Sequence, residues 1–376
     1  MPRYIPLLFA LFLSLPAHAA LPVPAPPELA ASAWLLVDFN SGKVLAEHNA
    51  DQQVEPASLT KMMTAYAVFK EIAGRNLKLS DEATISEKAW RTGGSKMFIE
   101  VGKQVSIEDL LKGLIIQSGN DAAVALAEFV AGDETTFAQL MNRHADRMGL
   151  TNTHFVNSTG LPDPEHLTTA RDLAVIATAL VRDFPEHYGW YSIKEFEYNG
   201  IRQFNRNKLL WRDASVDGIK TGHTEAAGYC LVTSAEREGM RLVSVVLGTA
   251  NDKARADANQ ALLNYGFRFY NTRRVFSGGE RLEDAKVWKG ASDTLPIGIA
   301  SDLWVTVSRR QFKDLKSEMS INTRLVAPIT EGQQVGTLKL TLDGETVAEH
   351  PLIALRSIAE GGFFTRISDG IKLWFE

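Results

Sequence analysis

Three short runs in this sequence carry residue types that together can support acyl transfer. The runs are Ser58-Leu59-Thr60-Lys61, Ser118-Gly119-Asn120 and Lys220-Thr221-Gly222. Each run alone is weak evidence, because serine and lysine three residues apart usually mark the solvated surface of a capped helix. Their order along the chain and their contexts make the set more specific. The first is expected at the start of a helix, the second in a loop between helices and the third at the end of a strand.

Ser58 and Lys61 have the spacing of a nucleophile and its base. Residues i and i+3 of a helix lie on one face, about 5–6 Å apart at Cβ, so Lys61 can reach Ser58 Oγ and take its proton. Lys61 must be neutral to do so. Burial and a second cation both disfavour the charged ammonium, and Lys220 can supply that cation while also holding a substrate carboxylate. Backbone N–H groups at the start of the helix can stabilise an oxyanion.

The other two polar residues complete a proton path. Ser118 can relay a proton to a leaving amine, and Asn120 can orient both a peptide amide and Lys61. From the residues alone, these three runs therefore predict two-step acyl transfer through a serine ester.

The set resembles the serine-x-x-lysine, serine-x-asparagine and lysine-threonine-glycine triplet of penicillin-binding proteins and serine β-lactamases. Longer runs extend the resemblance to the low-molecular-mass penicillin-binding proteins, the D-alanyl-D-alanine carboxypeptidases of Gram-negative bacteria. These runs cover residues 56–62, 117–122, 217–224 and 264–269. The resemblance spans essentially the whole mature chain. It implies an enzyme that removes the terminal D-alanine from peptidoglycan stem pentapeptides, without a cofactor, and that is acylated by β-lactam antibiotics.

The resemblance also implies a role for each site residue. Ser58 is the acyl acceptor, Lys61 the base, and Ser118 and Asn120 the second element. The strand that binds substrate contributes Lys220, Thr221, Gly222 and His223, whose backbone N–H supplies the second oxyanion donor. A helix arginine that binds the terminal carboxylate corresponds to Arg255, with Arg241 and Arg268 as alternatives.

Two other functions remain open at this stage. A β-lactamase uses the same triplet, but class A enzymes carry a deacylating glutamate in a Glu-x-x-Leu-Asn run, which is missing here. Glu165 lies in roughly the right interval but in a different sequence context. A non-catalytic wall-binding or morphogenetic protein could keep a relic site. The complete triplet argues against this second alternative.

The elements that must position these residues follow from hydrophobic periodicity. Helices are expected at 58–72, 106–115, 121–130, 136–148, 170–181 and 252–265, and strands at 34–38, 43–45, 216–220, 229–235 and 242–247. Helices mixed with antiparallel strands predict an α+β fold. The resemblance implies a transpeptidase/β-lactamase-like catalytic domain of this kind.

The predicted domain boundaries follow changes in pattern along the chain. Residues 1–19 have the features of a signal peptide, with a short apolar stretch before Ala17-His18-Ala19. The catalytic domain is expected at 28–275, and a small β-rich domain at 276–360. Residues 361–376 are predicted to form an amphipathic helix that binds a membrane surface, since aromatic and charged residues fall on opposite sides. A helix docked on the β-rich domain is the alternative.

Composition limits the classes of partner and cofactor that this chain is expected to bind. The formal charge is −5 and no block of basic residues occurs, which disfavours nucleic acid. The eight histidines show no metal-ligand spacing, and no metal or other cofactor is expected. Cys230 is the only cysteine, and it is expected to be a buried, inert thiol. Together, the signal peptide, the amphipathic tail and the resemblance to Gram-negative carboxypeptidases imply an exported protein, peripherally attached to the periplasmic face of the inner membrane.

Overall fold

The computed structural model describes residues 23–374, and its larger part is built on a five-stranded antiparallel sheet. The order of the strands is β2-β1-β9-β8-β7, so β7 forms one edge. The strands are β1 (Ala33–Asp38), β2 (Val44–His48), β7 (Val216–Thr224), β8 (Gly228–Arg237) and β9 (Met240–Thr249).

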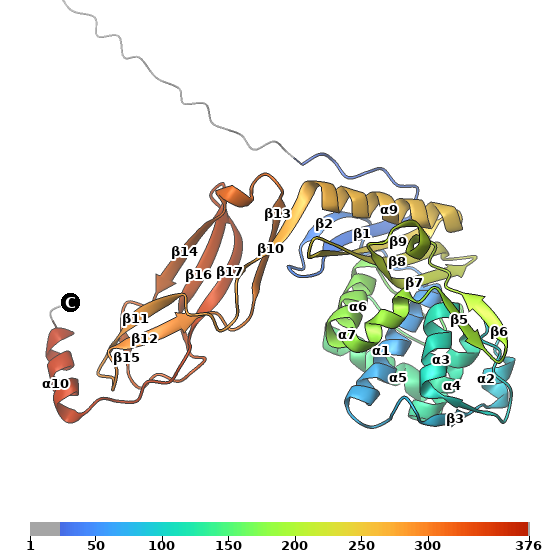
Figure 1. The fold of residues 1–376 in the computed structure, drawn as a ribbon, viewed down its shortest axis with the longest axis horizontal. Helices are drawn as coiled ribbons and strands as arrows, with labels where there is room; N and C mark the ends of the chain where they lie inside the picture. The colour runs from blue at the N-terminus through green and yellow to red at the C-terminus, as the bar shows by residue number, and fades with distance from the viewer. Residues whose placement is uncertain (1–22, 375–376) are drawn as a thin grey trace, which may run out of the picture.

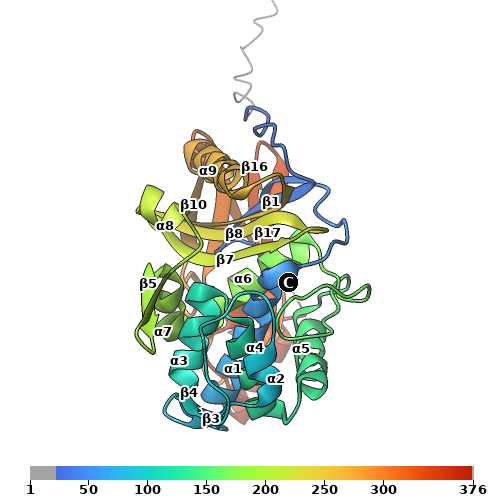
Figure 2. The ribbon, with the colours of Figure 1, turned by 90° about the vertical axis from the view of Figure 1, so that its right-hand side faces the viewer.

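Helices cover both faces of this sheet (Figures 1 and 2). Helix α9 (Asp252–Phe269) packs on one face, and α1 (Lys61–Ala73) lies in the helical cluster on the other. Leu35 of β1 joins the core on the α1 side, whereas Leu36 joins the core under α9. Successive side chains of a strand point to opposite faces, which explains why β1 is apolar at consecutive positions.

The remaining elements of this part surround α1. The helices are α2 (Glu87–Arg91), α3 (Ile107–Lys112), α4 (Asn120–Ala131), α5 (Glu134–Met148), α6 (Ala170–Asp183), α7 (Pro185–Tyr188) and α8 (Leu209–Arg212). Short helical turns are η1 (Ala57–Thr60), η2 (Gly113–Gln117) and η3 (Gly189–Ser192). Two small hairpins pair β3 (Glu82–Thr84) with β4 (Gln104–Ser106) and β5 (Glu195–Tyr198) with β6 (Ile201–Phe204).

The rest of the chain is mostly β-structure with a core of its own. Strands β10 (Tyr270–Phe276) and β13 (Leu303–Ser308) pair with each other. A six-stranded sheet has the order β14-β16-β17-β12-β11-β15. Its strands are β11 (Glu283–Trp288), β12 (Thr294–Gly298), β14 (Lys316–Ile321), β15 (Leu325–Val326), β16 (Gln334–Leu342) and β17 (Glu345–Ala354), with η4 (Phe312–Asp314) before β14.

A buried polar network joins the two parts. Asp38 Oδ2 accepts a hydrogen bond from Thr272 Oγ1 at 2.6 Å, and Thr272 Oγ1 contacts Thr306 Oγ1 at 2.7 Å. On the turn after β1, Lys43 Nζ donates to Thr306 O at 3.0 Å. Because Asp38 is fully buried, its hydrogen bonds offset the cost of removing a carboxylate from water. The network therefore fastens β10 and β13 to the β1–β2 turn.

The chain closes with helix α10 (Phe363–Lys372), which Figure 1 shows at the end of the molecule remote from the five-stranded sheet. Its apolar side is open to solvent, since Phe364 is 84% exposed, and Trp374, just beyond the helix, is 91% exposed. Its polar side faces the protein, because Asp369 Oδ2 accepts a hydrogen bond from the backbone N–H of Lys289 at 2.8 Å. The apolar side is therefore not docked on the β-rich core.

No helix within residues 23–374 is long and apolar enough to cross a membrane. The predicted signal peptide and the last two residues of the predicted tail helix lie outside the described residues.

The predicted α+β fold is confirmed. The short elements α2, α7, α8 and β3 to β6 were not predicted, and the predicted elements differ in where they begin and end. The helix predicted from Ser58 starts with the 3₁₀ turn η1, and its α-helical part begins at Lys61. The helix predicted through Ile115 is capped by Ser106, as expected, but becomes π-helical at Gly113. Helix α9 continues past the predicted residue 265 to Phe269.

Candidate active site

The contact between Ser58 and Lys61 is the centre of the site. Ser58 lies in η1, and Lys61 begins α1. Lys61 Nζ donates hydrogen bonds to Ser58 Oγ at 3.0 Å, to Asn120 Oδ1 at 2.7 Å and to Thr159 O at 2.6 Å. These acceptors hold the amine against the hydroxyl at a distance at which a proton can pass between them.

Burial tunes Lys61 for this proton transfer. The residue is 1% exposed, and removal from water lowers its pKa to about 7, with a further lowering by Arg206 and an opposing effect of Asp121. A lysine with a pKa near 7 is partly neutral at neutral pH and can act as a base. We expected Lys220 to be the cation that lowers the pKa of Lys61. After burial, however, the largest lowering of this pKa comes from Arg206. The pKa of Lys220 is itself lowered far below its ordinary value by burial and by Lys61.

Asn120 reaches Lys61 from the turn between α3 and α4, and Ser118 lies in the same turn and lines the cavity that contains Ser58. The segment η2 ends at Gln117 and is followed by Ser118, which has a left-handed backbone with φ of 68°. Asn120 begins α4, and its Nδ2 donates to Gly93 O at 2.7 Å while its Oδ1 accepts from Lys61. Both side chains are buried. The turn therefore fixes the Asn120 amide between Lys61 and the loop that contains Gly93.

Strand β7 forms the opposite side of the site. Lys220 and Thr221 are buried, and Lys220 Nζ donates to Thr221 O at 3.1 Å. His223 is exposed, and its ring lies over Tyr229 with ring centroids 4.0 Å apart. The predicted residues of this strand are therefore a buried lysine and threonine followed, after Gly222, by an exposed histidine.

Gly222 permits β7 to approach the turn that carries Ser58. A Cβ atom at this position would lie 3.2 Å from both Pro56 O and Leu59 Cγ. Contacts that short force a neighbour to move, and Pro56 O belongs to the backbone of the turn. The absence of a side chain at Gly222 therefore brings the strand within reach of Ser58.

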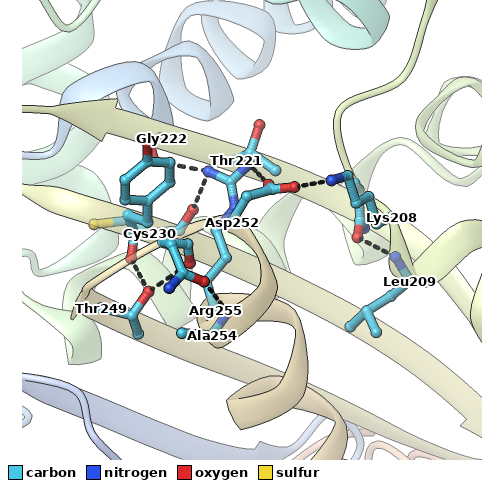
Figure 3. Close-up of polar contacts among 12 residues, drawn as sticks. Lys208, Leu209, Thr221, Gly222, Cys230, Thr249, Asp252, Ala254 and Arg255 are labelled. Atoms are coloured by element: carbon cyan, nitrogen blue, oxygen red, sulfur yellow. Dashed lines mark hydrogen bonds and ion pairs between the residues drawn. The ribbon is translucent and has the colours of Figure 1, made fainter.

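Arg255 lies beneath β7, where it was predicted to bind a carboxylate, but its guanidinium already has partners (Figure 3). It donates to Gly222 O at 3.0 Å and to Cys230 O at 3.3 Å, and it forms an ion pair with Asp252. Asp252 also pairs with Lys208. Arg255 thus connects β7 and β8 to the first turn of α9 and contributes positive charge to the cavity wall.

Arg206 and Lys208 are site residues that the sequence did not reveal. They follow the β5–β6 hairpin and line the same cavity as Ser58. Burial lowers the pKa of Arg206, as does neighbouring Arg255, while Asp252 raises it. This loop belongs to none of the three motifs. Its basic residues are of the kind expected in any solvent-exposed turn, so nothing in the sequence places them near Ser58.

The loop 157–166 is a second element that the sequence did not reveal. Besides Thr159 O on Lys61, it contributes Gly160, where an added Cβ would lie 1.7 Å from Ala57 O. His166 Nε2 contacts Thr60 Oγ1 at 2.8 Å, while the backbone N–H of Val156 donates to His166 Nδ1 at 3.2 Å. Since Nδ1 is an acceptor, neutral His166 carries its proton on Nε2 and donates it to Thr60.

A cavity of about 610 Å³ brings most of the predicted residues together. Its lining includes Ser58, Ser118, Asn120, Thr221, Gly222, His223 and Arg255. Lys61 and Lys220 lie behind this lining, in contact with it. The two alternatives to Arg255 lie outside this lining. Arg268 lines a different cavity, and Arg241 forms an ion pair with Asp217 at 2.6 Å.

The sequence also led to expectations about metal binding and about the thiol of Cys230. Within residues 23–374, no group of three or more histidine, cysteine, aspartate or glutamate side chains is arranged to hold a metal ion. Cys230 is buried, and burial raises the pKa of its thiol to about 11. A thiol with so high a pKa is a poor nucleophile at neutral pH.

Comparison with known proteins assigns both parts of the chain. Residues 21–251 match the family model for D-alanyl-D-alanine carboxypeptidase, and residues 270–360 match that for the C-terminal domain of penicillin-binding protein 5. The chain is 45% identical over 361 residues to D-alanyl-D-alanine carboxypeptidase DacA of Escherichia coli, covering 94% of this chain and 90% of that protein.

Solved structures agree with these matches. Penicillin-binding protein 5 of Haemophilus influenzae superposes with a TM-score of 0.86 at 39% identity, covering 90% of this chain and 100% of that one. Penicillin-binding protein D2 of Listeria monocytogenes in its ampicillin-bound form superposes with a TM-score of 0.59 at 30% identity, covering 64% of this chain and 98% of that one.

Proposed function

Because the chain belongs to the D-alanyl-D-alanine carboxypeptidase family of serine peptidases, we propose that its Ser58, Lys61 and Ser118 perform that family's reaction. The protein is a serine-type carboxypeptidase that removes the terminal D-alanine from peptidoglycan pentapeptides, and it binds β-lactams. The observation that supports this assignment of residues is the 3.0 Å hydrogen bond from Lys61 Nζ to Ser58 Oγ, made by a lysine whose pKa is about 7.

The reaction has two steps. Ser58 Oγ attacks the carbonyl carbon of the penultimate D-alanine, and its proton passes to Lys61 Nζ. The C–N bond of the tetrahedral intermediate then breaks, and a proton relayed by Ser118 reaches the amine of the departing D-alanine. Water hydrolyses the remaining ester and restores the Ser58 hydroxyl.

The strand β7 and its surroundings bind the substrate in this proposal. The backbone N–H groups of Ser58 and His223 stabilise the oxyanion, and Asn120 orients the peptide. Thr221 and the positive charge of Arg206 and Arg255 attract the terminal carboxylate, since cations in a cavity wall favour anionic ligands. Gly222 keeps β7 close enough to Ser58 for these contacts. A β-lactam carries the equivalent carboxylate and acylates the same serine.

The lining of the cavity bears on the β-lactamase alternative. Asp252 is the only acidic side chain among the described residues that line it, and this carboxylate is paired with Lys208 and Arg255. Glu165 is exposed and outside that lining. No glutamate among the described residues of this lining can therefore activate water for rapid ester hydrolysis. We thus expect the penicilloyl ester to be long-lived.

One experiment tests the nucleophile and the substrate together. The purified mature chain is incubated with a pentapeptide ending in D-alanyl-D-alanine and, separately, with a labelled penicillin, and the labelled residue is located by mass spectrometry. We expect the label on Ser58 and loss of D-alanine release in Ser58→Ala. Ser95→Ala removes another serine of the cavity lining and is the matched control, which should keep its activity. D-alanine release by Ser58→Ala at the native rate, or fast repeated turnover of penicillin, would contradict the proposal.

The same family membership supports a proposal for location and domain roles. Residues 1–19 direct export, 28–275 form the catalytic domain, and the β-rich domain at 276–360 separates it from a peripheral anchor at 361–376 on the periplasmic face of the inner membrane. Supporting this, α10 exposes Phe363, Phe364, Ile367 and Ile371 to solvent, and Trp374, two residues beyond the helix, is also exposed.

Co-sedimentation with vesicles containing anionic lipid tests the anchor. Phe364→Glu should greatly reduce the bound fraction, because it places a charge on the exposed apolar side. Thr365→Glu adds the same charge elsewhere on α10 and should reduce it less. Equal binding by Phe364→Glu and the unmodified chain would exclude α10 as the anchor.

A further inference from the structure

A second cavity, of about 770 Å³, lies further along α1 from the Ser58 site. It is lined by the β1–β2 hairpin and by α1, α5 and α6. No residue lines both this cavity and the one that contains Ser58. Its volume is within the range of about 300–1,000 Å³ that is typical of small-molecule sites.

The interior of this cavity is apolar. Its apolar lining comprises Leu35, Val37, Val44, Tyr66, Met148, Ala174, Val175 and Ala179. Val44 is 37% and Val175 is 38% exposed, so branched aliphatic side chains remain open to solvent at the mouth. An apolar ligand segment that covered them would be stabilised by leaving water.

The polar part of the lining is cationic. It contains Lys70, Arg147, Arg171, Arg182 and His144, and no acidic side chain. Lys70 and Arg182 share Asp183, at 3.1 and 2.8 Å, and Arg171 pairs with Glu47 and Asp51, both at 2.7 Å. These carboxylates lie outside the lining and leave one cation uncompensated.

That cation is Arg147. Its exposed guanidinium forms no hydrogen bond or ion pair with any described residue. The pKa of buried His144 is lowered first by burial and then by Arg147 and Lys70, while Glu71 opposes this lowering. His144 Nε2, one turn before Arg147 on α5, is a buried nitrogen without a hydrogen-bond partner in the structure. A cavity with an apolar interior and an unpaired guanidinium at its edge is complementary to an anion with an apolar body.

We propose that this cavity is a binding site for a medium-chain fatty acid, with the alkyl chain between α6 and the β1–β2 hairpin and the carboxylate on Arg147. A carboxylate matches the planar fork of a guanidinium and can accept two parallel hydrogen bonds. The alkyl chain covers Val44 and Val175. This site is independent of the proposed reaction at Ser58.

Calorimetric titration of the mature chain with sodium decanoate, below its micelle concentration, tests the site. We expect saturable binding with one equivalent. 1-Decanol has the same chain without the charge and should bind at least about tenfold more weakly, which corresponds to about 1.4 kcal/mol.

Variants assign the binding to this cavity. Arg147→Gln should weaken decanoate about tenfold, whereas Arg143→Gln, which changes an exposed arginine of the same helix outside the lining, should stay within about twofold. Val175→Trp should block the mouth and abolish binding, with its melting temperature as a check on folding. The proposal is overturned by absence of saturable binding, by equal binding of decanol, or by equal effects of the Arg147 and Arg143 substitutions. Release of D-alanine by Arg147→Gln should remain unchanged, so failure of either proposal leaves the other testable.

Discussion

The pKa of Lys61 makes the rate of Ser58 acylation depend on pH in a way that a single substitution should shift. Acylation requires neutral Lys61, and its pKa is about 7. Below that pH the neutral fraction falls about tenfold per pH unit, to roughly a tenth at pH 6 and a hundredth at pH 5. The acylation rate should fall by the same factors.

Arg206→Gln removes the cation that, after burial, does most to lower the pKa of Lys61. Loss of a nearby positive charge makes protonation of Lys61 easier, so its pKa must rise. The midpoint of the rate profile should therefore move to higher pH. Because the variant is then on the steep part of its profile at pH 6, the rate there should fall by a larger factor than the rate at pH 9.

Stopped-flow acylation by a labelled penicillin between pH 5 and pH 9 measures this midpoint. Lys208→Gln is the matched control, since it removes a cation from the same cavity lining that does not contribute to the lowered pKa of Lys61. Weaker binding of the penicillin carboxylate in either variant would scale the whole profile without moving its midpoint. An unchanged midpoint in Arg206→Gln, or the same displacement in Lys208→Gln, would refute the reasoning.

Other predictions concern the loop 157–166 and the polar network that joins the two parts. Gly160→Ala should lower the unfolding free energy by at least about 2–3 kcal/mol, measured by urea unfolding, and should also lower the acylation rate. Gly132→Ala is the control, because Gly132 has the same φ of 83° but open space around it. It should lower the unfolding free energy by only about 1 kcal/mol. Burial lowers the pKa of His166 to about 4, so between pH 6.5 and pH 4 the unfolded chain holds a proton that the folded chain does not. Stability should thus fall by up to about 3 kcal/mol as pH decreases through that window, and His166→Gln should remove this part of the dependence; identical pH profiles for variant and parent would count against it. Asp38→Asn should weaken the contact with Thr272 and so loosen the two parts of the chain. The distribution of distances between spin labels placed on the two parts should therefore broaden. An unchanged distribution would show that this network does not fasten the two parts.

The sequence indicated the residues that act locally. Ser58 and Lys61 share one helical turn, so their proximity follows from backbone geometry alone, and it survives the change from α-helix to η1 at Ser58. Ser106 caps its helix through a contact three residues away, which is also local. The apolar alternation of β1 and the amphipathic pattern of α10 likewise depend only on neighbours within a few residues.

Long-range contacts were predictable only through family resemblance or not at all. Asn120 meets Lys61, and β7 meets η1, because helices pack on a sheet edge, and no spacing in the sequence encodes those distances. The approach of Arg206 to Lys61 was missed for the same reason, and the contacts of Arg255 with Gly222 O, Cys230 O and Asp252 could not be anticipated from sequence spacing.

The sequence by itself therefore determined which side chains can do chemistry, the helical turn that pairs Ser58 with Lys61, and the fold class. Only the tertiary structure decided the pKa of Lys61, because burial and the field of Arg206 come from segments distant in the chain. Local geometry depends on backbone dihedral angles and near neighbours, whereas desolvation and Coulomb interactions depend on whatever the fold places nearby.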